Sequence, residues 1–188
     1  MKKYLKLIPL MLYPYAYLIG MVGLYIADEV LSLFSVSVIP EYLFWGVIIL
    51  YNVYVLFIAV FNAVLTAGKR YTAYDGAKIN LIVKGVQIPA YILHFLMGLA
   101  GLIMSVWGIG FIVIAVLVDL LTILLTGISA VGCSIKMKKE GLLPLSGAIL
   151  TGIGSFIYCA DIAAAIVFLV LGRKQQRERK AVEEERNG

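Results

Sequence analysis

The chain has 188 residues, of which 62% are hydrophobic and 14% are charged, and its formal net charge is +5. An ordinary soluble domain is about 45–50% apolar and about 25% charged, so this composition excludes an ordinary soluble fold. The lysines and arginines lie in short clusters between apolar runs, as in membrane proteins, and do not indicate a nucleic-acid-binding protein. We therefore predict one all-α domain, a transmembrane helical bundle of about five spans.

The first apolar run extends from about Leu5 to Ala27 and follows two lysines. Its length predicts a first transmembrane helix, which Pro9 and Pro14 should bend because proline lacks a backbone donor. A cleaved signal peptide is the alternative. Tyr25 occupies a position where the cleavage site needs a small residue, so the sequence favours an uncleaved helix.

Three further segments are apolar and long enough to cross a bilayer. They extend from about Tyr42 to Ala67, from Ile79 to Met104 and from Ile109 to Gly132. A polar loop, residues 68–78, separates the first two. Only Ser105–Gly108 separates the last two, so we expect them to form a tight antiparallel hairpin.

The last apolar segment runs from about Leu142 to Leu171, and residues 173–188 form a charged tail. We predict that this segment is a fifth span, which makes residues 1–172 a single membrane domain. A fifth span places the basic tail opposite the other basic clusters, against the tendency of lysine and arginine to remain in the cytoplasm. The alternative is a broken, re-entrant segment that returns the tail to the cytoplasm. Three glycines are candidates for such a break: Gly147, Gly152 and Gly154.

The two helices of the predicted hairpin each carry a line of polar side chains, spaced three and four residues apart and therefore on one helix face. The lines are Asn80, Lys84, Gln87, Tyr91 and His94 on the first helix, and Asp119, Thr122, Thr126, Ser129 and Cys133 on the second. In an antiparallel hairpin, residues at equal depth have numbers with a constant sum. Taking the second line in reverse order gives five pairs whose numbers each sum to 213: Asn80 with Cys133, Lys84 with Ser129, Gln87 with Thr126, Tyr91 with Thr122, and His94 with Asp119. The register therefore predicts that His94 lies beside Asp119.

A carboxylate at the centre of a membrane helix costs roughly 2.5–3.5 kcal/mol, so Asp119 needs a partner or a function. One interpretation is that Asp119 and His94 only hold two helices together. The other is that they form a proton-carrying or ligand-binding pair. Asp161, near mid-depth of the last segment, is expected to complete a cluster with them. Lys84 and Gln87 are expected toward the inner mouth of this site, with Lys84 extending to the lipid headgroups.

Recognised catalytic motifs are missing from the sequence. It has no phosphate-binding loop, dinucleotide-binding fingerprint, nucleophile elbow or zinc-protease helix. Two cysteines and one histidine cannot form an ordinary four-ligand zinc site. Catalysis by two facing aspartates would need Asp119 and Asp161, but the usual sequence contexts of such enzymes are absent. We therefore expect neither an enzyme nor a bound cofactor or metal.

Two stretches of polar and aromatic residues resemble an uncharacterised family of small multi-pass membrane proteins from Gram-positive bacteria. The first contains Asn80, Lys84 and residues 87–91, and the second is Tyr158-Cys159-Ala160-Asp161. The resemblance covers about the last two-thirds of the chain. It implies a protein of the bacterial cytoplasmic membrane, and the family has no known activity to transfer.

Two classes of function are consistent with these features. The first is a small transporter- or channel-like protein with His94, Asp119 and Asp161 as its ionisable centre. The second is a non-transporting accessory or scaffold subunit, in which the same residues only pack helices. Transport predicts a water-accessible cavity, whereas a scaffold predicts dry, fully paired polar groups. In both cases we expect a homo-oligomer or a membrane partner in addition to the lipid bilayer.

Overall fold

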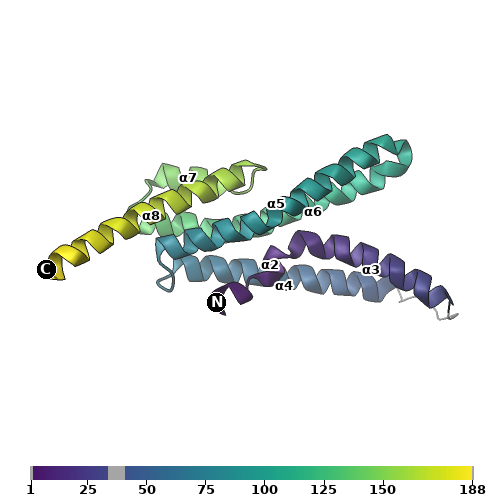
Figure 1. Ribbon diagram of the computed structural model, residues 1–188, viewed down its shortest axis with the longest axis horizontal. Coiled ribbons are helices and arrows are strands. Elements are labelled where there is room, and N and C mark those ends of the chain that lie inside the picture. Colours follow the sequence, from purple (N-terminus) through teal and green to yellow (C-terminus); the bar gives the residue numbers. More distant parts are fainter. Residues whose placement is uncertain (1, 34–40, 188) are drawn as a thin grey trace.

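The structure, a computed structural model, describes residues 2–33 and 41–187, in which all regular secondary structure is helical (Figure 1). The all-α prediction is therefore confirmed for this part of the chain. The elements are α1 (Lys2–Leu5), α2 (Ile8–Met11), α3 (Tyr13–Leu33), α4 (Glu41–Ala67), α5 (Ala73–Ile103), the 3-10 helix η1 (Ser105–Gly108), α6 (Ile109–Lys139), α7 (Leu145–Gly154) and α8 (Ala160–Asn187).

Three helical segments are long and apolar enough to cross a membrane: Trp45–Ala67, Ala73–Ile103 and Ser105–Lys139. They correspond to the three predicted middle spans. Helix α5 begins earlier than its apolar pattern indicated, because the Thr72 hydroxyl caps its first turn by accepting from the Asp75 amide at 3.1 Å. With 31 residues each, α5 and α6 are about 46 Å long, which exceeds the roughly 30 Å of a bilayer's hydrocarbon core.

The first apolar run is divided into α1, α2 and α3, whereas one continuous helix bent at its two prolines was predicted. Pro9 lies in the first turn of α2, and Pro14 lies in the first turn of α3. Proline suits these positions because the first backbone amides of a helix have no partner within the helix. Helix α3 then continues to Leu33, beyond the predicted end at Ala27.

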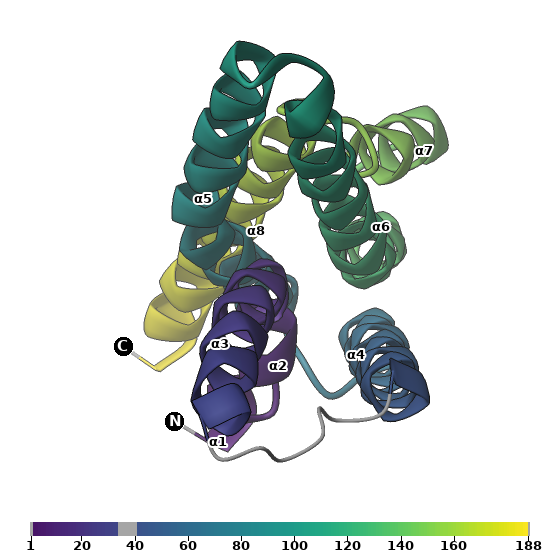
Figure 2. The ribbon, with the colours of Figure 1, turned by 90° about the vertical axis from the view of Figure 1, so that its right-hand side faces the viewer.

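Helices α5 and α6 form the predicted antiparallel hairpin, with η1 as its turn (Figures 1 and 2). Their backbones meet at Gly101 and Gly108, where a Cβ added to Gly101 would lie 2.8 Å from the Gly108 carbonyl oxygen. Helix α4 packs against α6, and α8 packs against α5. At Gly132 a Cβ would lie 2.4 Å from the Ala63 carbonyl oxygen, so glycine permits the close approach of α4 and α6.

The prediction of one continuous last span is wrong, and the alternative of a broken segment agrees with the structure. Helix α7 ends at Gly154, and α8 begins at Ala160 after a turn in which Cys159 has a φ of 66°. The chain reverses there, and α8 returns along α5 until Gly172 meets Tyr74 (Figure 1). Helix α8 continues without a break through the charged residues to Asn187.

Candidate functional site

The predicted pairing of His94 with Asp119 is confirmed. His94 Nδ1 on α5 lies 2.5 Å from Asp119 Oδ1 on α6, and the two side chains are 2% and 16% exposed. The same hairpin register places Gly101 against Ile112, as its constant sum requires. Spacing along two helices was sufficient for this pair because a four-residue turn fixes how the helices align.

Lys84 and Asp161 form a second buried pair that the sequence analysis did not predict. Lys84 Nζ on α5 donates to Asp161 Oδ2 on α8 at 2.8 Å, and the side chains are 1% and 3% exposed. The prediction that Lys84 extends to the headgroups is therefore wrong. The reason is the reversal after α7, which places the first turn of α8 beside the middle of α5.

The expected cluster of His94, Asp119 and Asp161 is also replaced by two separate pairs. In the described ranges 2–33 and 41–187, no three histidine, cysteine, aspartate or glutamate side chains lie close enough together to hold a metal ion. The second oxygen of Asp161 accepts from the Ile162 amide at 2.8 Å, so this carboxylate also satisfies a backbone donor in the first turn of α8. Both Asp161 oxygens consequently have donors.

Gln87 does not lie at the mouth of a site either. Its side-chain amide is fully buried and donates to the Leu10 carbonyl oxygen at 2.8 Å, which joins α5 to the last turn of α2. The Leu10 carbonyl is free to accept this bond because the residue that would donate to it in a regular helix, four positions on, is Pro14, and proline has no backbone N–H. The predicted role of Gln87 is thus replaced by a packing role.

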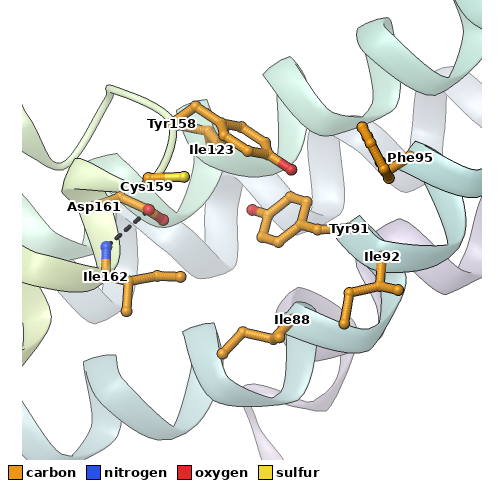
Figure 3. A pocket seen from close by; sticks show the side chains of 9 residues that line it. All are labelled: Ile88, Tyr91, Ile92, Phe95, Ile123, Tyr158, Cys159, Asp161 and Ile162. Atoms are coloured by element: carbon orange, nitrogen blue, oxygen red, sulfur yellow. Dashed lines mark hydrogen bonds between the residues drawn. The ribbon is translucent and has the colours of Figure 1, made fainter. Parts of the chain in front are cut away.

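A cavity of about 260 Å³ lies beside Asp161, between α5, α6 and the turn that precedes α8. Its walls are mainly apolar, and its polar side chains are Tyr91, Tyr158 and Asp161 (Figure 3). The two tyrosine rings meet edge to face, with centroids 5.6 Å apart. The Tyr91 hydroxyl is buried and, in the part of the chain that the structure describes, has no hydrogen-bond partner. An unpartnered hydroxyl is available to a ligand or to water.

Cys159 completes the rim of this cavity. It is exposed and lies in the left-handed backbone region, whereas Cys133 is buried in α6. Neither Tyr158 nor Cys159 was predicted to line a site. A signal for the break was present, since three glycines lie within one apolar segment and an aspartate follows them seven residues later.

A third polar contact joins α4 to the hairpin. The Asn62 side chain on α4 donates to the Ser129 hydroxyl on α6, and both residues are buried. Ser129 had been paired with Lys84 by the hairpin register. In the structure the two residues have different partners, because α4 packs against α6 and α8 packs mainly against α5 (Figure 2).

Comparison with protein-family models, with curated proteins and with solved structures finds no match. The resemblance to a family of Gram-positive membrane proteins stays a prediction. Function must therefore be argued from the two buried pairs and the cavity.

Proposed function

We propose that the chain is a multi-pass protein of a bacterial cytoplasmic membrane, with both ends in the cytoplasm. Three long apolar helices support the membrane location. Both ends of the chain lie in the same half of the molecule as the α4–α5 and α6–α7 connections, opposite η1 (Figure 1). Basic residues gather in these connections and in the tail, and such residues remain on the cytoplasmic side. They are Lys69, Arg70, Lys136, Lys138, Lys139, Arg173, Lys174, Arg177, Arg179, Lys180 and Arg186.

Within this membrane we propose a small transporter- or channel-like protein whose site is the cavity beside Asp161. The observation that carries the proposal is a carboxylate that lines a cavity and lies in the first turn of α8, directly after the break in the last apolar segment. Asp161 lies about 18 Å along α8 from Arg173, which is near the middle of a bilayer core of roughly 30 Å. Transporters bind solutes near the midplane at helices broken in this way.

The chemistry of the cavity defines the class of solute. Five aliphatic or aromatic side chains besides the tyrosines form its walls: Ile88, Ile92, Phe95, Ile123 and Ile162. A small, mostly apolar solute with one hydrogen-bonding group matches these walls and the free Tyr91 hydroxyl. A cationic group would compete with Lys84 for Asp161, which would couple solute entry to the breaking of an ion pair.

Cys159 provides the test, because a transport site must be reached by water. We expect a membrane-impermeant, cationic methanethiosulfonate to modify Cys159 of the full chain in sealed phosphatidylcholine vesicles. These reagents react with thiolates, which form only where the sulfur contacts water. Labelling is measured as the mass increase of the intact protein. The Cys159→Ser variant is the matched control, since it retains the buried Cys133.

Modification of Cys159 from the aqueous phase supports the cavity as a transport site. Protection of Cys159 in vesicles, followed by full labelling after unfolding in detergent, contradicts it. A tyrosine variant adds a second readout. Tyr91→Phe should leave the fold intact and change the labelling rate only if the water that reaches Cys159 also fills the cavity beside Tyr91.

One observation favours the scaffold as a second candidate function. Both buried pairs find their partners within the chain, at 2.5 Å for His94–Asp119 and 2.8 Å for Lys84–Asp161. A scaffold would use them only to hold α6 and α8 against α5 and would present the outer helix faces to a second copy or a membrane partner. Protection of Cys159 from water is the outcome that this candidate requires.

A further inference from the structure

A groove of about 530 Å³ runs between α6 and α7 and shares no lining residue with the Asp161 cavity. Its sides are aliphatic and aromatic along most of its length, with Ile149 and Ile153 of α7 among them. Lys138 and Lys139 lie at the cytoplasmic end that we propose for α6. The groove is therefore apolar along its length and cationic at one end.

The two lysines differ from their neighbour Lys136 in what they contact. Lys136 is buried, donates to the Gly68 carbonyl oxygen at 2.8 Å and pairs with Glu140 at 3.1 Å. Lys139 is exposed and has one donor bond, to the Ala67 carbonyl oxygen at 3.1 Å. Lys138 is exposed and forms no ion pair within the described residues. Among residues 2–33 and 41–187, neither ammonium group at the groove has an anionic partner.

The length of α7 matches one half of a bilayer. Its ten residues span about 15 Å, and one leaflet of hydrocarbon is also about 15 Å thick. An acyl chain of the cytoplasmic leaflet can therefore lie along the groove while its headgroup stays level with the two lysines. A groove of this length without the lysines would accept any phospholipid, whereas the unpaired positive charge selects an anionic one.

We propose that the groove between α6 and α7 binds an anionic phospholipid of the cytoplasmic leaflet. Its phosphate lies at Lys138 and Lys139, and one acyl chain packs along Ile149 and Ile153. The proposal rests on the membrane placement given above, but not on transport. It gives the short helix α7 a role in lipid binding, since α7 contributes no residue to either of the two buried pairs.

Competition between two lipids in detergent solution tests this proposal. The full chain is mixed with equal concentrations of phosphatidylglycerol and phosphatidylcholine that carry the same acyl chains, and bound lipids are counted by native mass spectrometry. We expect phosphatidylglycerol to be retained preferentially. Lys138→Gln should reduce this preference about fivefold, the effect of one basic residue near an anionic headgroup. Lys138→Arg should retain it.

The matched control is Lys174→Gln, which removes the same charge from an exposed position on α8, where the lysine side chain is 74% exposed. Ile149→Trp, which places a bulky ring in the groove, should reduce the binding of both lipids. Equal retention of both lipids by the unmodified chain overturns the proposal. An equal loss of preference in Lys138→Gln and Lys174→Gln also overturns it. In that case the overall positive charge of the protein, rather than a specific site at the groove, would attract the anionic lipid. Neither variant alters the cavity at Cys159, so the labelling test of transport remains independent.

Discussion

Lys84 and Asp161 are buried at 1% and 3% exposure, so each charge depends on the other. Removing one partner leaves an uncompensated charge, whereas removing both leaves an apolar contact. We expect Lys84→Met to lower the free energy of unfolding by about 3–5 kcal/mol. The double variant Lys84→Met, Asp161→Leu should recover most of this loss. Unfolding of the purified chain in mixed detergent micelles, followed by circular dichroism, measures both.

The exposed pair Lys174–Glu178 provides the control for this comparison. Its atoms are 3.9 Å apart and its side chains are 74% and 62% exposed, so Lys174→Met should change stability by less than about 0.5 kcal/mol. A Lys84→Met variant as stable as the Lys174→Met variant would show that Lys84 is not buried against Asp161. A double variant as unstable as the single one would show that packing, rather than charge, dominates this contact.

The two ion pairs differ in how far the sequence could predict them. His94 and Asp119 are 25 residues apart on helices joined by a short turn, and the spacing of polar side chains fixed their register. Lys84 and Asp161 are 77 residues apart, and their contact exists only because α8 reverses direction after α7. Periodicity describes faces within one helix, so it carries no information about such a reversal.

At the scale of elements, glycine positions decide how closely helices pack. Gly132 and Gly110 both lie in α6, but a Cβ would meet the Ala63 backbone at the first and nothing within 4 Å at the second. We expect Gly132→Ala to separate α4 from α6 and to lower the unfolding midpoint. Gly110→Ala should be neutral or stabilising, because alanine favours a helix interior over glycine by about 0.5–1 kcal/mol. The same detergent unfolding experiment compares them, and equal effects would contradict the close approach of α4 and α6.

The presence and order of the middle helices could be predicted from apolar length, although α5 and α6 extend beyond the predicted bounds, and the broken last segment could not. Length alone favoured one long helix over residues 142–171, since no proline lies within the segment after Pro144. The break instead places Asp161 at a helix start, where it accepts a backbone bond and meets Lys84. The contact between Asp161 and Lys84 therefore overrides the local preference of this segment for one long helix. The residues of the segment alone do not indicate such a contact.

At the scale of the whole molecule, the reversal of α8 brings the tail back to the α6–α7 connection. Arg179 pairs with Glu140 at 3.1 Å, and Gly172 meets the start of α5. We predict that the tail and the 136–141 connection lie on the same side of the membrane. Cysteines at Lys139 and Lys180 of a Cys133→Ser, Cys159→Ser chain should both be protected from an impermeant maleimide in intact cells. Both should react in inverted vesicles.

A cysteine at Val106, in the η1 turn, is the control for this topology. Its native side chain is exposed at the opposite end of the hairpin, so it should react in intact cells and be protected in inverted vesicles. Labelling of the tail together with Val106 would restore the topology of five full spans.

Lys84 and Asp161 are 77 positions apart, which also sets an order of events during synthesis. A ribosome adds about 5–20 residues per second, so Lys84 is made about 4 to 15 seconds before its partner. The buried ion pair can therefore form only after the first turn of α8 has been synthesised, because until then the carboxylate that pairs with Lys84 does not exist.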